Sequence, residues 1–413
     1  MRLQSLMKKL LLGFAVIFLF ACGSGGNNSS AVDEVLPLPS AVHFVKGTGV
    51  GGVSAFLLKQ GAQSAGYAQI SNYMQYSIKL YKIIYRTTYK GKSILASGLI
   101  AYPTGISVPM PTLIVGNIMT YADKDAPSEA AIPNNFPSLA AIASTGYLTL
   151  IPDMIGYGVS KDIIYPMQNY EHSANAMIDF IHAGEEFIKS AKLQVSGKKF
   201  LVGYSEGGYI AMATLKMIET GPASGISINA TAVGAGGYNL VYLLNYIIDD
   251  THSDTYSAPS HLAMFLYSYN SMYDWGRPLS DFFQEPYASR IPGLLNGTYN
   301  REQIDLQLTT NLNTLFNSDF LGNLKNNKGQ EQSLFNALTE NSVDDWIPTS
   351  MLKIFHSEND EKVPFSDSKA TYDKMVSKGS GSVQWLASDK NGNHVDSGIE
   401  FMEFVYQWFE TIK

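Results

Sequence analysis

The stretch FLVGYSEGGYI, residues 200–210, decides the fold. The run KKFLV at 198–202 is typical of a strand buried on both faces, and it stops at Gly203. Ser205 then stands among glycines, and YIAMATLKMI at 209–218 has the apolar spacing of a helix. The sequence therefore predicts a serine on a tight turn between a buried strand and a helix.

Residues 203–207, Gly-Tyr-Ser-Glu-Gly, match the pattern G-x-S-x-G, whose central serine is a nucleophile. The sharp turn strains the backbone at the serine, so its neighbours must be small. The following helix points its N-terminus at the reacting centre and favours negative charge there. Such a short pattern also occurs by chance, but here the strand and the helix that it requires flank it. We therefore interpret Ser205 as a nucleophile rather than as a polar residue of a glycine-rich loop.

A serine nucleophile needs a base, and the base needs a carboxylate to orient it. His394 lies in DKNGNHVDSG, a polar loop between the apolar run VQWLA at 383–387 and the last helical pattern. A histidine in such a loop is commonly just solvated. At the last strand-to-helix junction, however, it is the best candidate for the base among the seven histidines.

The candidate acid lies in KIFHSENDEKVPF, residues 353–365. Asp360 follows an apolar run in the pattern H-x-x-x-D-x-x-V-P, which favours it as the orienting carboxylate. Glu358 and Glu361 compete for the role, and chain order alone does not separate the three. The order serine, acid, histidine is the one found with this type of turn.

These motifs resemble those of the α/β-hydrolases, specifically the secreted lipase- and esterase-like serine hydrolases of bacteria that are related to fungal secretory lipases. The resemblance runs from about Tyr76 to the C-terminus, and the stretches that carry it are GYSEGGY, IPDMIGYGVSKDIIYPM, HSENDEKVP and GNHVD. It implies a serine hydrolase that acts on carboxylic esters or lipids through Ser205, His394, Asp360 and an acyl-enzyme intermediate. Neither a metal ion nor an organic cofactor is expected.

Two backbone N–H groups are expected to stabilise the oxyanion. One belongs to Glu206, the residue after the nucleophile. The other is expected in GNIMT, residues 116–120, from Ile118 or Met119. This stretch departs from the His-Gly-rich sequence that the family usually has there, so the first donor stays open between these two residues.

Two other functions remain as alternatives. A serine peptidase or aminopeptidase would use the same turn and the same three residues. An aminopeptidase needs a carboxylate for the substrate amine, and Glu206 is a candidate. A non-catalytic, surface-binding lipoprotein on a degenerate scaffold is supported only by the altered stretch at 116–120.

The rest of the chain predicts an α/β fold with a mostly parallel central sheet flanked by helices. Short apolar runs alternate with helical patterns, as expected of strands and helices in such a sheet. A hairpin with Gly91 in its turn precedes them, and the aromatic, Asn-rich segment 238–345 is expected to form a helical cap. The hydrolase core is expected at 41–237 and 346–413. The predicted strands are 112–116, 147–151, 199–203, 230–234, 351–355 and 383–387, and the predicted helices are 173–191, 206–218 and 399–409.

The N-terminus has the pattern of a signal peptide, residues 1–22, with basic residues before the apolar stretch 10–20. Cys22, the only cysteine, ends it in a sequence that resembles a bacterial lipobox. We expect a lipid-anchored protein on a bacterial outer membrane or cell surface, with 23–40 as a flexible tether. Alternatively, Cys22 is removed with the signal peptide, and the protein is periplasmic or secreted.

The amino-acid composition limits the number of domains and the classes of binding partner that are expected. The chain has 413 residues, of which 45% are hydrophobic, enough for one large core with insertions or for two domains. The net charge of −7 argues against a nucleic-acid-binding protein, which needs clustered basic residues. No second cysteine is present, so no intrachain disulfide is expected. The sequence gives no indication of the oligomeric state.

Overall fold

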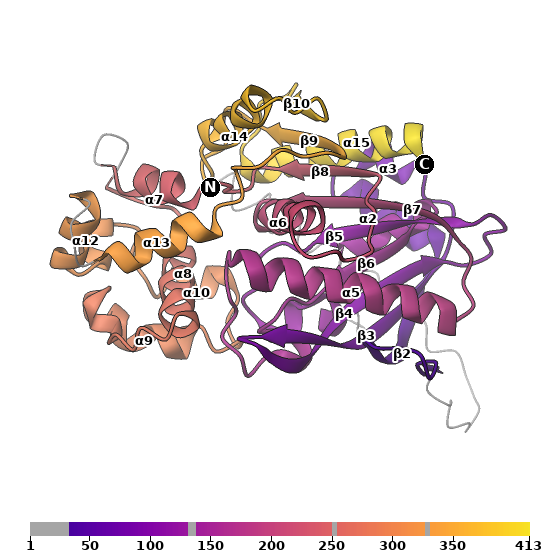
Figure 1. Cartoon of the computed structure of the whole chain (residues 1–413), viewed down its shortest axis with the longest axis horizontal. Coiled ribbons are helices and arrows are strands. Elements are labelled where there is room, and N and C mark those ends of the chain that lie inside the picture. Colours follow the sequence, from indigo (N-terminus) through magenta and orange to yellow (C-terminus); the bar gives the residue numbers. More distant parts are fainter. Residues whose placement is uncertain (1–32, 131–137, 250–253, 327–330) are drawn as a thin grey trace.

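The computed structural model describes residues 33–130, 138–249, 254–326 and 331–413. The predicted signal peptide with Cys22 and residues 23–32 of the predicted tether lie outside the described residues. One sheet of ten strands forms the body, and a group of helices lies against one end of it, at the left of Figure 1.

Strands 5 to 10 run parallel to one another, and strands 1 to 4 form an antiparallel extension at one side. The order in the sheet is β1-β2-β3-β4-β6-β5-β7-β8-β9-β10. Each of the six predicted apolar runs forms a strand, which confirms the predicted fold class. The strands are β1 Glu34–Val35, β2 Phe44–Val53, β3 Ile78–Tyr89, β4 Lys92–Pro103, β5 Met110–Gly116, β6 Leu148–Pro152, β7 Val195–Tyr204, β8 Ala230–Gly234, β9 Met351–His356 and β10 Val383–Ala387.

The predicted hairpin is formed by β3 and β4. Its two-residue loop consists of Lys90 and Gly91, with φ of 48° and 71°. Two consecutive left-handed residues fit the right-handed twist of the paired strands, and glycine adopts that conformation without strain.

The antiparallel edge begins earlier than the sequence predicts. The expected tether extends to residue 40, but Glu34 and Val35 already pair with β2 as strand β1. Strand β2, FVKGTGVGGV, was not predicted because its glycines weaken the strand pattern. Its pairing with β3 over most of its length stabilises it instead.

Helices cover both faces of the sheet (Figure 1). On one face, α5 and α6 contribute to an apolar core that continues into the helices at the end of the sheet. On the other, α2, α3 and α15 enclose a second apolar core. The helices of the body are α2 Ala55–Ser64, α3 Ala68–Ser71, α4 Pro127–Ala130, α5 Tyr170–Ser190, α6 Glu206–Thr220, α14 Phe365–Ser377 and α15 His394–Ile412, with short 3-10 turns η1 Asp123–Asp125, η2 Ser138–Thr145 and η3 Gly158–Ser160.

The chain between β8 and β9 forms the helices at the end of the sheet, in the range where a cap was predicted (Figure 1). Its asparagines explain where several helices begin. Asn239, Asn300, Asn311 and Asn317 each accept a backbone N–H of the first helical turn. The helices are α7 Leu240–Ile248, α8 Pro259–Met272, α9 Tyr287–Leu294, α10 Arg301–Asp305, α11 Leu312–Leu315, α12 Ser318–Lys325 and α13 Gln332–Asn341, with η4 Leu279–Asp281. We call residues 238–345 the cap.

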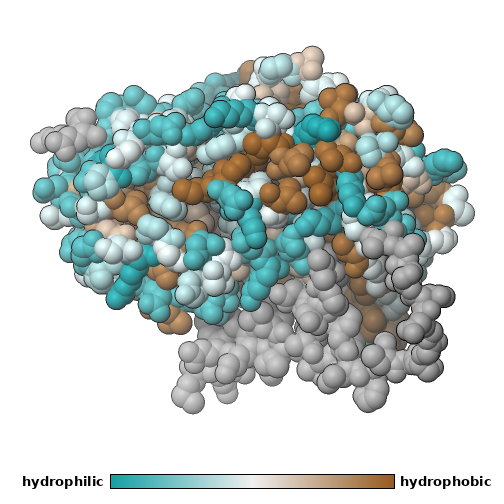
Figure 2. Space-filling view, turned by 90° about the horizontal axis from the view of Figure 1, so that it is seen from below, coloured by the Kyte–Doolittle hydropathy of each residue, from teal (hydrophilic) through white to brown (hydrophobic). Residues whose placement is uncertain are grey.

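The surface combines hydrophilic and apolar areas. Seen from below, hydrophilic side chains cover most of the cap end, and an apolar band crosses the middle of this face (Figure 2). Among the described helices, none combines the length and the apolar character needed to cross a bilayer.

Candidate active site

Ser205 occupies the sharp turn between β7 and α6. Its backbone has φ 57° and ψ −128°, a conformation that side-chain-bearing residues rarely adopt. The Ser205 N–H donates to the carbonyl of Gly234 over 2.8 Å, which ties the turn to the end of the neighbouring strand β8. Backbone strain of this kind persists only where the surroundings hold it, and it is common at functional sites.

Three glycines allow α6 to begin directly against the strands. A Cβ atom on Gly203 would lie 1.8 Å from the carbonyl oxygen of Gly207. A Cβ on Gly207 would lie 2.2 Å from the carbonyl oxygen of Gly116, at the end of β5. Backbone atoms thus fill the space that any side chain would need, which explains why glycines surround the serine.

His394 lies directly opposite Ser205. It is the first residue of α15, after the N-cap Asn393, whose side chain accepts two backbone N–H groups of the helix. The Ser205 hydroxyl lies 2.9 Å from Nε2 of His394. The other ring nitrogen, Nδ1, lies 2.6 Å from Oδ2 of Asp360. The carboxylate can only accept, so Nδ1 carries the hydrogen and a neutral ring accepts from Ser205 at Nε2.

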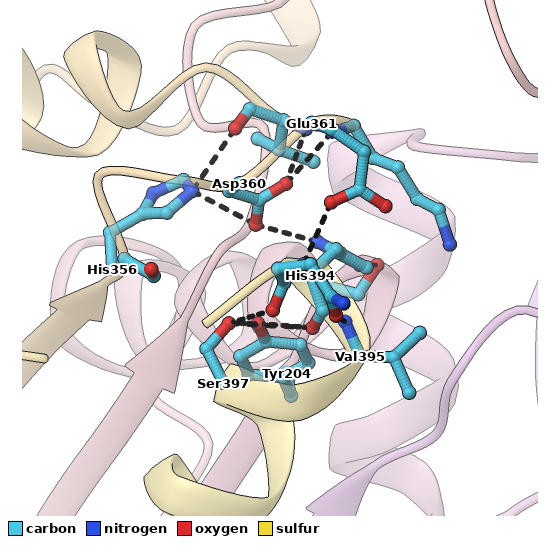
Figure 3. Close-up of polar contacts among 12 residues, drawn as sticks. Tyr204, His356, Asp360, Glu361, His394, Val395 and Ser397 are labelled. Carbon is cyan, nitrogen blue, oxygen red and sulfur yellow. Dashed lines mark hydrogen bonds and ion pairs between the residues drawn. The ribbon is translucent and has the colours of Figure 1, made fainter. Parts of the chain in front are cut away.

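The structure separates the three competing carboxylates, of which Figure 3 shows Asp360 and Glu361. Asp360 alone of the three meets the His394 ring, and its Oδ1 accepts the backbone N–H groups of Lys362 and Val363, both at 2.9 Å. Glu361 instead accepts the backbone N–H of His394 over 2.9 Å, and Glu358 is exposed.

The environment of Asp360 favours its charged form. Burial by itself raises the pKa of a carboxyl group, but hydrogen bonds from His356 and His394, together with the electrostatic interaction of the carboxylate with these two rings, outweigh it. The pKa of Asp360 is therefore lowered below its ordinary value. His356 was overlooked in the sequence, although it opens the H-x-x-x-D pattern. Its Nε2 lies 3.2 Å from Oδ2 of Asp360.

Two of the three residues predicted for the oxyanion site lie at the cavity next to Ser205. Glu206 and Met119 line this cavity, whereas Ile118 is not part of its lining and is 54% exposed. The Glu206 carboxyl is buried and accepts the Tyr165 hydroxyl over 2.8 Å. Burial, opposed by hydrogen bonds from Tyr165 and Gln168, raises the pKa of Glu206 to about 7.

The cavity next to Ser205 is lined by apolar side chains of the cap and by a few polar residues. Its volume is about 770 Å³, counting space open to solvent. The polar residues include Lys362 and His261. Burial, aided by the charges of Arg301 and Lys362, lowers the pKa of His261 to about 3, so this ring is neutral at pH 7. The apolar lining comes chiefly from the cap residues Leu240, Leu243, Leu244, Ile247, Leu262, Phe265 and Leu338.

Within the described ranges, no group of three or more His, Cys, Asp or Glu side chains is arranged to hold a metal ion.

Solved structures are similar in fold to most of this chain. A protein of Legionella pneumophila described as a hydrolase is 22% identical, with a TM-score of 0.78 over 90% of this chain and 98% of its own. The rice cell wall degrading esterase LipA of Xanthomonas oryzae is 21% identical, with a TM-score of 0.76 over 89% and 98%. Candida antarctica lipase A in its closed state is 14% identical, with a TM-score of 0.60 over 77% and 73%. The chain has the α/β-hydrolase fold. No family model and no curated protein matches the sequence.

Within the α/β-hydrolase fold, the turn after a central parallel strand carries the nucleophile, and the base comes from near the C-terminus. Ser205 follows β7, which lies between parallel neighbours β5 and β8. His394 lies on the last helix and Asp360 on the loop after β9, so the structure brings together the three side chains that the sequence singled out.

Proposed function

We propose that the protein is a serine hydrolase that cleaves carboxylic esters. The proposal rests on one observation above all: the hydrogen-bonded series from Ser205 through His394 to Asp360, which begins on a strained turn at an apolar cavity. The likeness to an esterase and a lipase of the same fold agrees with it but, by itself, concerns the fold.

The first half of the reaction forms an acyl-enzyme. Nε2 of His394 takes the proton of Ser205 as Oγ attacks the ester carbonyl, and Asp360 holds the imidazolium through Nδ1. The carbonyl oxygen becomes an oxyanion, which the backbone N–H of Glu206 stabilises together with that of Met119 or Ile118. The intermediate then collapses, its C–O bond breaks, and His394 protonates the departing alcohol.

The second half releases the acid. A water molecule takes the place of the alcohol, and His394 removes its proton as the oxygen attacks the acyl carbonyl. Collapse of the second tetrahedral intermediate returns the proton to Ser205. The carboxylic acid leaves, and the enzyme is restored without any other co-reactant.

The apolar lining favours esters with a hydrocarbon acyl group. The cavity runs from Ser205 along Leu240 and Leu244 of α7 and Leu262 and Phe265 of α8. Burial of each methylene in such a lining contributes about 0.8 kcal/mol. We infer that the acyl chain lies between these helices and that short alkyl chains gain affinity as they lengthen.

A peptidase has less support. Glu206 is the carboxylate that would hold a substrate amine, but it is already bound by the Tyr165 hydroxyl, and its raised pKa leaves it partly neutral near pH 7. The surface-binding alternative does not explain the strained backbone at Ser205 or the hydrogen bond between Ser205 and His394.

Two measurements test the proposal together. A fluorophosphonate probe should label one serine, and peptide mapping should identify it as Ser205. In parallel, p-nitrophenyl esters from acetate to palmitate should be hydrolysed faster than aminoacyl p-nitroanilides. Labelling without ester turnover would favour the peptidase, and no labelling at Ser205 would favour the binding protein.

The membrane anchor is a separate proposal. We infer that diacylated Cys22 anchors the enzyme to a bacterial membrane, on the lipobox-like sequence at the end of the signal peptide. Cys22→Ser should move the enzyme from the detergent phase to the aqueous phase in detergent partitioning of expressing cells. Equal partitioning of the two proteins would contradict the anchor and leave the ester hydrolase proposal untouched.

A further inference from the structure

His356 is a buried histidine that the proposed reaction does not use. It ends strand β9, four residues before Asp360, and its side chain is fully buried. Nε2 lies 3.2 Å from Oδ2 of Asp360 and 3.1 Å from the carbonyl oxygen of Val363. Nδ1 lies 2.7 Å from the hydroxyl of Ser368 on α14. Figure 3 shows the ring on the opposite side of Asp360 from His394.

The partners of His356 assign one of its hydrogens. A carbonyl oxygen and a carboxylate oxygen can only accept, so Nε2 carries a hydrogen and shares it between Val363 and Asp360. A hydroxyl can donate or accept, so Ser368 suits Nδ1 in either state. The ring is therefore held at both nitrogens, by the loop after β9 and by α14.

With this donor, the carboxylate of Asp360 is fully engaged. Oδ1 accepts the backbone N–H groups of Lys362 and Val363, and Oδ2 accepts His394 and His356. Two carboxylate oxygens offer about four acceptor positions, so no position is left for water. Rotation of the carboxylate about its bond to Cβ would break all four hydrogen bonds together.

We propose that His356 is a positioning residue, which holds Oδ2 of Asp360 in line with Nδ1 of His394. This inference rests on the proposed function, since it assigns His356 a part in the same reaction. His356 is not among the residues that line the cavity, so it acts through Asp360 and does not touch the substrate. Its loss should therefore lower kcat and leave KM unchanged.

Three replacements of His356 separate positioning from packing. In His356→Gln, the amide nitrogen reaches about as far as Nε2 and keeps the donor to Asp360. In His356→Asn, the shorter amide reaches only the position of Nδ1, and His356→Leu has no donor. We expect the Asn and Leu variants to lose about 10- to 100-fold in kcat at unchanged KM, by analogy with the loss that follows when the hydrogen-bond partner of a metal-binding histidine or carboxylate is removed. The Gln variant should stay near the wild-type kcat.

The pH profile gives a second readout. Without the donor from His356, Oδ2 of Asp360 is no longer held in line with Nδ1 of His394 and stabilises the imidazolium less. The acidic limb of the kcat/KM profile should therefore move to lower pH in the Asn and Leu variants. The other groups that face His394 stay unchanged in every variant: Tyr204 beside the ring, Glu361 at its backbone, and His261 and Lys362 across the cavity.

Ile354→Ala is the matched control. Ile354 is fully buried on β9, two residues before His356, and it makes none of the hydrogen bonds described here. It should lower the melting temperature while keeping the wild-type kcat and pH profile. If the Asn and Leu variants are too unstable to purify, the low-field proton resonance of the His394–Asp360 hydrogen bond can be compared in the wild type and His356→Gln, where it should be retained.

The role of His356 would be overturned if the Asn and Leu variants kept the wild-type kcat and pH profile. It would also be overturned if the Gln variant were as slow as the Leu variant, or if the Gln variant had lost the low-field resonance. A wild-type protein without ester turnover and without labelling at Ser205 would instead overturn the proposed function.

Discussion

Ser205→Ala should lower kcat for a p-nitrophenyl ester by roughly a million-fold, the loss measured when the serine of a comparable triad is removed. The reason is that no other group lies at the position from which Oγ attacks and then holds the acyl group. The residual rate should reflect the cavity and the backbone donors alone. Steady-state kinetics with purified protein would measure the loss, and the fluorophosphonate label should disappear with it.

The structure predicts that this variant folds normally. The Ser205 hydroxyl bonds to His394, an interaction that the fold does not depend on, and alanine retains the Cβ that serine already places in the strained turn. Its melting temperature should stay close to that of the wild type. Ser196→Ala, at an exposed serine on the same strand β7, is the matched control and should keep full activity. Ester turnover that survives in Ser205→Ala would rule Ser205 out as the nucleophile.

Asp360→Asn should lower kcat at neutral pH by about 10⁴-fold, because the amide imposes the wrong tautomer on His394. The backbone N–H groups of Lys362 and Val363 require an oxygen at the Oδ1 position, so the amide NH₂ faces His394. Nδ1 must then accept, which leaves the hydrogen on Nε2. A ring in that state cannot take the proton of Ser205.

Glu358→Gln is the control for Asp360→Asn. The sequence pattern makes Glu358 a candidate for the orienting carboxylate, but in the structure this residue is exposed. Glu358→Gln should retain the wild-type kcat and KM when both variants are compared by steady-state kinetics at the same pH. A larger loss in Glu358→Gln than in Asp360→Asn would contradict the assignment of Asp360.

The sequence by itself determined the features that depend on local pattern. Short apolar runs between helical patterns predicted the parallel strands of the sheet, since buried strands read as continuous apolar stretches. Lys90 and Gly91 between two alternating segments predicted the hairpin. The glycines around Ser205 predicted the turn, because backbone segments approach each other so closely there that no side chain would fit between them.

Tertiary structure decided what depends on contacts between distant segments. Strand β2 has too many glycines to be recognised alone, and its hydrogen bonds to β3 define it. Glu358, Asp360 and Glu361 are nearly equivalent in the sequence. Asp360 alone is held by two backbone N–H groups so that its other oxygen faces a ring 34 residues further along the chain. The cavity, built largely from the cap, and the second histidine on Asp360 likewise arise only when the chain is folded, because hydrogen bonds and packing join residues that no local pattern connects.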